Sequence, residues 1–198
     1  MNKILFYILV GFVLLMLFKE DSIDLGPGVL APNEPKQEKI STAKSFNFKE
    51  FTITPLANFE IKAKVLSREN YSSGREAELS PTDLALGWGR MSDKTITDTL
   101  TIWQSGRWFR WKTQTLPIPQ REIEHHSANM HMLPQDESVT LALKEVRKGD
   151  IVNIKGYLVN VKAGDGWHWN SSLSRTDTGS GACEIVFLKE ISVENYGP

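Results

Sequence analysis

Histidine is the side chain best suited to acid–base or metal chemistry near neutral pH. Three of the four histidines, His125, His126 and His131, lie within seven positions of one another. Imidazoles this close together could hold zinc or copper, but their spacing fits no defined metal signature, and no HExxH motif is present. The alternative is a polar loop whose histidines hydrogen-bond to the backbone. We therefore expect no metal site and no cofactor.

Cys183 is the only cysteine, which excludes an intramolecular disulfide and every multi-cysteine metal site. A glycine-rich stretch precedes it, and backbone N–H groups in such a loop could form an oxyanion hole. With His168 or His126 as the base, Cys183 would be the nucleophile of a hydrolase or transpeptidase. The stretch resembles the loop of L,D-transpeptidases but lacks their box histidine and following arginine. The alternative is a cysteine packed as a small hydrophobe.

Aromatic and basic side chains alternate over residues 107–112. If this segment is a strand, one face carries Trp108, Arg110 and Lys112, an aromatic ring with cationic neighbours that is suited to stacking on a sugar ring or a nucleobase. Trp167 and Trp169 would extend that face, with His168 on the opposite side. The alternative is that most of these rings belong to the core, since aromatic residues favour strands.

Two segments, residues 124–131 and 172–177, concentrate polar side chains beyond what a simple connection requires. We predict that they meet in space and form a ligand site at the mouth of the domain. The alternative is a structural network in which these groups only hydrogen-bond one another. The predicted ligand-binding residues are His126, Asn129, His131, Trp169, Arg175 and Asp177.

The elements that would position these residues begin after a strongly apolar N-terminus. Residues 4–18 carry no charge, and 15 residues of helix span roughly 22 Å, against about 30 Å for a bilayer core. Because Lys3 and Lys19 flank the segment and no small-residue cleavage site follows, we expect an uncleaved membrane anchor. The alternative is a cleaved signal peptide. Lys3 and the free amino terminus favour a cytoplasmic N-terminus.

We divide the chain into an anchor (1–20), a proline-containing linker (21–45) and an extracytoplasmic, β-rich domain (46–198). The hydrophobic pattern changes face around Gly156, which predicts a β-bulge there. The sequence predicts strands over 59–65, 151–161, 167–174 and 184–188, a hairpin over 102–113 turning at 104–106, a hairpin turn at 164–166, and helices beginning near 80 and 93 and over 136–148. The fold class is mainly β with short helices (α+β), a small, partly open OB-like barrel.

The charge is balanced, with 23 basic and 24 acidic residues and a net charge of −1. Such a chain has no general electrostatic attraction for nucleic acid, so we expect no nucleic-acid partner.

The stretches LSPTDLALGWGRMSD, HSANMHMLP and SSLSRTDTGSGACEIV resemble a family of uncharacterised bacterial membrane-anchored proteins with no established activity. The resemblance implies a bacterial envelope origin and carries over no catalytic residue. It agrees with a single-pass inner-membrane protein whose C-terminal domain lies in the periplasm. We expect a non-enzymatic binding domain for a glycan or another envelope protein. The alternative is the cysteine enzyme described above.

Overall fold

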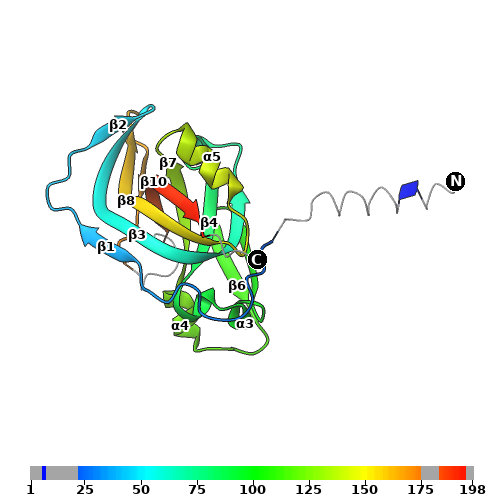
Figure 1. The fold of residues 1–198 in the computed structure, drawn as a ribbon. Helices are drawn as coiled ribbons and strands as arrows, with labels where there is room; N and C mark the ends of the chain where they lie inside the picture. The colour runs from blue at the N-terminus through cyan, green and yellow to red at the C-terminus, as the bar shows by residue number, and fades with distance from the viewer. Residues whose placement is uncertain (1–5, 8–21, 175–182, 195–198) are drawn as a thin grey trace.

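The computed structural model describes residues 6–7, 22–174 and 183–194, and most of its strands belong to one eight-stranded mixed sheet (Figure 1). A separate two-stranded hairpin and five short helices complete the described part. This confirms the expected mainly-β class with short helices. The sheet strands are β1 (Lys36–Lys39), β2 (Phe46–Phe48), β3 (Phe51–Asn70), β4 (Thr82–Gly87), β7 (Ser127–Pro134), β8 (Ile151–Ala163), β9 (His168–Asn170) and β10 (Glu184–Val193). The hairpin strands are β5 (Thr101–Ser105) and β6 (Trp108–Lys112), and the helices are α2 (Arg75–Leu79), the 3₁₀ helix η1 (Gly89–Ser92), α3 (Lys94–Thr97), α4 (Gln120–His125) and α5 (Glu137–Glu145).

The long strand β3 organises the sheet. Residues 51–64 of β3 pair with β8, whereas residues 64–70 pair with β4. From β4 the pairing continues to β7, then β10, and then back to β8. Only β7 and β10 are parallel, and the other pairs of this set are antiparallel. The strands therefore form a partial ring of hydrogen bonds, not a closed barrel.

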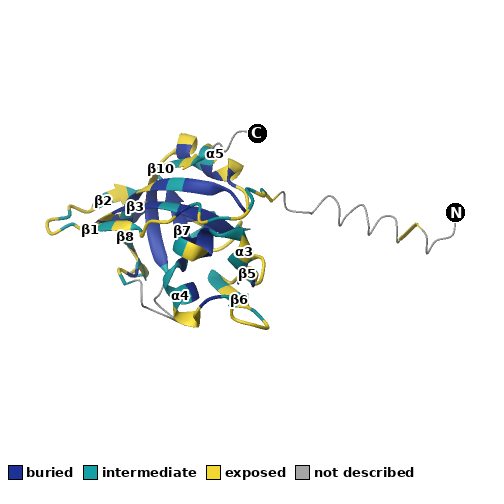
Figure 2. Cartoon of the chain, turned by 60° about the horizontal axis from the view of Figure 1, so that its bottom comes forward, coloured by how far each residue is buried: buried dark blue, intermediate teal, exposed yellow. Residues whose placement is uncertain are grey.

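The ring strands bury much of their surface: β4 is buried on both faces, whereas the first part of β3 alternates between buried and more exposed residues. Figure 2 shows buried residues following the ring strands and exposed residues gathering on the loops and helices around them. One core cluster contains Phe59, Ile61 and Val65 of β3, and α5 packs Val139 and Leu143 against it. Two further clusters cover the opposite faces of the same strands. The predicted strand over 59–65 and the predicted helix over 136–148 are confirmed, and Asp136 caps α5 by accepting the Val139 N–H.

The predicted change of face in β8 is wrong. Ile154 and Leu158 both belong to the first cluster, and Val159 packs in the second, so the alternation continues through Gly156. The pattern misled because both faces of β8 carry buried apolar residues, so a change of parity along the strand does not mark a change of face. The irregularity lies on the partner strand, where the register of β10 shifts between Leu188 and Glu190.

The helix predicted near residue 80 is also wrong. Ser80 ends α2, and the strand β4 begins at Thr82. Every residue of β4 is buried, with Leu84 and Ala85 in different clusters on its two faces. Burial of both faces stabilises a strand here, and this outweighs the preference of the Ser80–Pro81 pair for the start of a helix. The short helix predicted near residue 93 is confirmed as α3, with Asp93 as its N-cap.

The hairpin over 102–113 is confirmed, but its turn is displaced. Ser105 pairs with Trp108, so Gly106 and Arg107 form a two-residue turn and Gln104 lies within β5. Both turn residues have positive φ, 57° for Gly106 and 66° for Arg107. This is the backbone that a tight hairpin requires, and glycine adopts it more readily than arginine. The turn predicted at 164–166 and the final strand are confirmed by β8–β9 pairing and by β10.

The chain from residue 22 is attached to the sheet. β1 pairs with β3, Ala31 is fully buried, and Ser22 forms a bridge with Lys148. This part of the predicted linker therefore packs on the domain. The predicted anchor lies outside the described residues except for Phe6 and Tyr7. Among the described residues, no helix is both long and apolar enough to span a bilayer.

Candidate functional site

A buried polar network surrounds Asp83 on the outer face of the ring. Asp83 of β4 lies opposite His131 of β7 in the antiparallel register, which places both side chains on one face. The Asp83 carboxylate is fully buried, and its Oδ1 accepts hydrogen bonds from Arg107 Nη1 at 2.8 Å and Ser80 Oγ at 3.2 Å. Its Oδ2 accepts one from Asn129 Nδ2 at 3.3 Å. These partners compensate for the loss of water around a buried charge.

His131 completes this network from β7. Its Nδ1 lies 2.9 Å from Asp83 Oδ2, an ion-pair distance, although the contact lacks hydrogen-bond geometry. The His131 imidazole is almost completely buried, and its centroid lies 4.6 Å from the centroid of the Trp169 ring. Asn129 Oδ1 in turn accepts a hydrogen bond from Gln104 Nε2 at 2.6 Å, which ties the network to the β5–β6 hairpin.

Arg107 fastens the tip of that hairpin to the ring. Its backbone N–H donates to the Tyr71 hydroxyl at 3.1 Å, and its carbonyl accepts from Asn129 Nδ2 at 3.1 Å. The guanidinium pairs with Asp83, donates to the Ser80 carbonyl at 3.0 Å and lies 3.9 Å from the Tyr71 ring centroid. A non-glycine residue at positive φ costs free energy, and these contacts offset that cost.

A pocket of about 530 Å³ opens next to the network. Its walls carry three aromatic side chains, from the β3–β4 connection, the hairpin tip and β9, and the Arg107 guanidinium lies over the first and the third of these rings. It therefore offers apolar ring faces beside a fixed cation, which suits a ligand with both a flat face and polar groups. The lining residues are Tyr71, Glu76, Gly106, Arg107, Trp108, His131, Trp169, Asn170 and Cys183.

The structure brings together three of the six predicted site residues. His131 and Trp169 line the pocket, and Asn129 lies in the network behind it. Arg175 and Asp177 lie outside the described residues, so the predicted meeting of the two loops stays a prediction. Asn129 and His131 lie on the strand β7 and not in a loop, which corrects the expected local structure.

His126 has a different environment and does not line this pocket. Its Nε2 lies 2.8 Å from Glu34 Oε1, and its Nδ1 lies 3.1 Å from the Glu122 carbonyl. Trp88 Nε1 donates to the other Glu34 oxygen at 2.8 Å, and the two rings meet edge to face. Glu34 thus holds the N-terminal part of the chain against α4 and β7. This arrangement serves packing.

Cys183 lines the pocket as a thiol. Its Sγ donates to the Arg107 carbonyl at 3.9 Å, and burial together with the nearby Glu184 and Asp83 carboxylates raises the pKa of Cys183 to about 12. The proposed bases have other neighbours: His168 Nδ1 lies 3.4 Å from the Gly166 carbonyl, and His126 pairs with Glu34. Neither imidazole is hydrogen-bonded to Cys183. A thiol that keeps its proton is a poor nucleophile.

Comparison with protein-family models, curated proteins and solved structures gives no match. The geometry of the pocket must therefore carry the functional argument. Within residues 6–7, 22–174 and 183–194, no group of three or more His, Cys, Asp or Glu side chains is arranged to hold a metal ion. The chemistry that this pocket offers is stacking, hydrogen bonding and charge.

Sequence reasoning missed Asp83, Arg107 and Tyr71. Asp83 was assigned to a helix start, and Arg107 to the face of a strand opposite Trp108. A signal was nonetheless present, because Asp83 directly precedes the apolar run Leu84–Ala85–Leu86. A carboxylate inside a buried strand requires a partner, and here the partner comes from a turn 24 residues further along the chain.

Proposed function

We propose that the ring is an OB-like barrel that binds a ligand on the outer face of β4 and β7. The order of pairing, the parallel β7–β10 pair and the position of α5 between β7 and β8 support this assignment. Proteins with this fold bind oligonucleotides and oligosaccharides on the second and third strands and the two adjoining loops. Here those strands are β4 and β7, and the adjoining connections contribute Tyr71 and Trp169 to the pocket.

The ligand that we propose is a glycan, bound without catalysis by a membrane-anchored bacterial envelope domain. The observation that carries this proposal is a pocket lined by the aromatic rings of Tyr71, Trp108 and Trp169, with the guanidinium of Arg107 over the Tyr71 and Trp169 rings. Aromatic faces stack on the apolar faces of sugars, and a held guanidinium donates to hydroxyl or carboxylate oxygens. The net charge of −1 argues against a nucleic-acid ligand, which attracts basic surfaces.

Titration of the full chain with soluble peptidoglycan fragments and chitin oligosaccharides tests this proposal, with calorimetry as the readout. We expect binding that the Trp169→Ala variant weakens at least tenfold, or about 1.4 kcal/mol. The Trp103→Ala variant is the matched control, because Trp103 is 38% exposed on β5 and does not line the pocket. Equal affinity of both variants, or no binding of any of these sugars, would contradict the proposal.

A further inference from the structure

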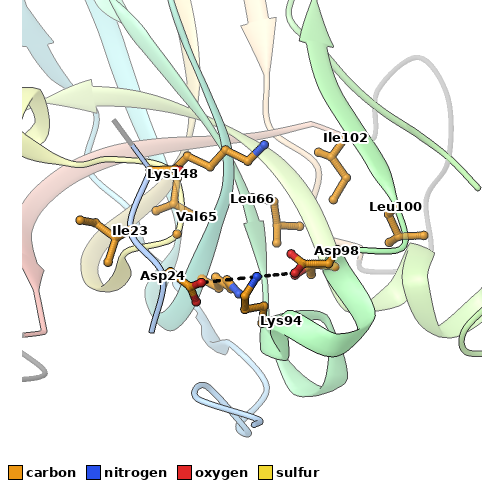
Figure 3. Close-up of a pocket in the computed structure, with 13 residues that line it drawn as sticks. Ile23, Asp24, Val65, Leu66, Lys94, Asp98, Leu100, Ile102 and Lys148 are labelled. Carbon is orange, nitrogen blue, oxygen red and sulfur yellow. Dashed lines mark hydrogen bonds and ion pairs between the residues drawn. The ribbon is translucent and has the colours of Figure 1, made fainter. Parts of the chain in front are cut away.

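A second pocket, of about 490 Å³, lies where the N-terminal segment crosses the sheet (Figure 3). The segment is held there by the Ile23 N–H, which donates to the Lys148 carbonyl at 2.8 Å. A Cβ on Gly149 would overlap the Ile23 carbonyl, so the segment approaches the sheet as closely as the backbone permits. Residues of β3, α3 and β5 complete the walls. The two pockets share no lining residue.

Lys64 is the unusual residue of this pocket. The residue is only 8% exposed, yet among the described residues its side chain forms no hydrogen bond or ion pair. Burial lowers the pKa of Lys64, and the charge of Lys94 lowers it further. The charges of Asp98, Asp24 and Asp93 only partly counter these effects. A buried ammonium without a partner is costly, and a protein normally provides an acid for it. Among the described residues, the pocket thus holds a cation that has no ion pair of its own, because the carboxylates of the lining pair with Lys94.

The two carboxylates of the lining are already engaged. Lys94 Nζ forms ion pairs with Asp24 at 3.5 Å and with Asp98, which the dashed lines of Figure 3 mark. Lys148 extends over the pocket from the opposite side, and no ion pair involves it within the described residues. Lys64 and Lys148 are therefore both available to an anion that enters from solvent.

Part of the wall is apolar. Val65, Leu66, Leu100 and Ile102 face the space in Figure 3. A ligand that matches the pocket therefore joins an anionic group to a small apolar part. Because Ser22 follows the apolar segment 4–18 by only four positions, this wall begins close to the predicted membrane anchor.

We infer that this pocket binds a phosphate group, with Lys64 and Lys148 of its lining as the cations that attract it. The group could come from an anionic phospholipid headgroup, whose glycerol would meet the apolar wall, or from free phosphate. The inference does not depend on the glycan pocket. Only the lipid source depends on the predicted anchor.

The test uses the full chain in a neutral detergent and measures the shift in melting temperature and the Kd by calorimetry. The probes are inorganic phosphate, short-chain phosphatidylglycerol and short-chain diacylglycerol. Phosphatidylglycerol binding at least tenfold tighter than phosphate identifies the lipid headgroup as the source, and equal affinity identifies free phosphate. Diacylglycerol should produce no shift. If neither phosphate compound binds, or if diacylglycerol binds equally well, the inference is wrong.

Two variants locate the site. Lys64→Met should weaken phosphate or phosphatidylglycerol binding at least tenfold, whereas Lys144→Met, an exposed lysine of α5, should leave it unchanged. Without ligand, Lys64→Met should melt at the same or a higher temperature, because it removes an unpaired buried charge; a purely structural lysine would lower it. Lys148→Gln, at an exposed position, should weaken phosphate or phosphatidylglycerol binding several-fold. It is the deciding variant for the site if Lys64→Met does not fold. The inference is overturned if Lys148→Gln binds phosphate with wild-type affinity while Lys64→Met either binds with wild-type affinity or misfolds. Glycan binding should stay unchanged in both variants.

Discussion

The backbone N–H, the backbone carbonyl and the guanidinium of Arg107 all form hydrogen bonds. Their partners are Tyr71, Asn129, Asp83 and Ser80, which lie on or beside the strands β3, β4 and β7. The importance of Arg107 follows from Asp83, whose carboxylate is completely buried. Removing one member of such a pair leaves an uncompensated charge, which costs about 3–5 kcal/mol. We therefore expect Arg107→Met to lower the free energy of unfolding by about that amount in urea denaturation. Arg110→Ala changes an exposed arginine of the same hairpin and should cost less than about 1 kcal/mol.

The same reasoning predicts a partial rescue of that variant. Changing Asp83 to Asn in the Arg107→Met background removes the orphaned charge while keeping a hydrogen-bonding side chain near Asn129 and Ser80. The double variant should be more stable than Arg107→Met alone. Purely additive losses would show that the cost of Arg107→Met comes from lost packing on Tyr71 instead.

Cys183 should react slowly with thiol reagents. A pKa of about 12 leaves about a thousandfold less thiolate at pH 8 than an ordinary exposed cysteine has. We expect alkylation by iodoacetamide to be slower by about that factor in the native chain and to reach the ordinary rate in urea. Because folding raises this pKa, the contribution of the thiol to stability is complete below about pH 9 and declines as the pH rises toward 12. Rapid native alkylation at pH 7 would revive the cysteine nucleophile.

At the scale of elements, Gly156 allows β8 and β10 to pair at the shifted register. A Cβ at this position would overlap the Phe187 carbonyl, which is backbone and cannot rotate away. Gly156→Ala should therefore lower the free energy of unfolding by about 3 kcal/mol, at the upper end of the cost of overpacking. Gly164→Ala is the matched control, because nothing lies within 4 Å of the added methyl group there and its φ is not positive. The melting temperatures of the two variants should differ clearly, and equal values would contradict the geometry of this strand pair.

Elements with one buried face could be predicted from the sequence, whereas burial on both faces misled the predictions for β4 and for the facing of β8. Residues 59–65 and the helix α5 alternate or repeat as one-sided elements do, and both were predicted correctly. The strand β4 has no polar face, so its only local signal was the Ser80–Pro81 pair, which wrongly indicated a helix. The same limit explains the site. His131 and Trp169 were found from residue type, whereas Asp83 and Arg107 meet only through tertiary packing.

At the scale of the whole molecule, the ring carries two pockets that different segments close. The β5–β6 hairpin and β9 border the aromatic pocket, and the N-terminal segment borders the lysine pocket. The rings of the first pocket and the unpaired cation of the second suit different ligands. The lysine pocket lies next to the beginning of the described domain, so a membrane anchor would place it toward the lipid surface.

The remaining prediction concerns that anchor. Lys3 and the free amino terminus favour a cytoplasmic N-terminus, and Lys19 opposes them, so the charge rule only moderately favours a periplasmic domain. We expect a periplasm-dependent phosphatase fused after Pro198 to be active and a cytoplasm-dependent fluorescent protein at the same position to be dark. The fusion should keep its full mass and fractionate with membranes, whereas a cleaved signal peptide would shorten it by about 2 kDa and release it. Fluorescence without phosphatase activity would place the domain in the cytoplasm and remove both the glycan and the periplasmic lipid leaflet as partners.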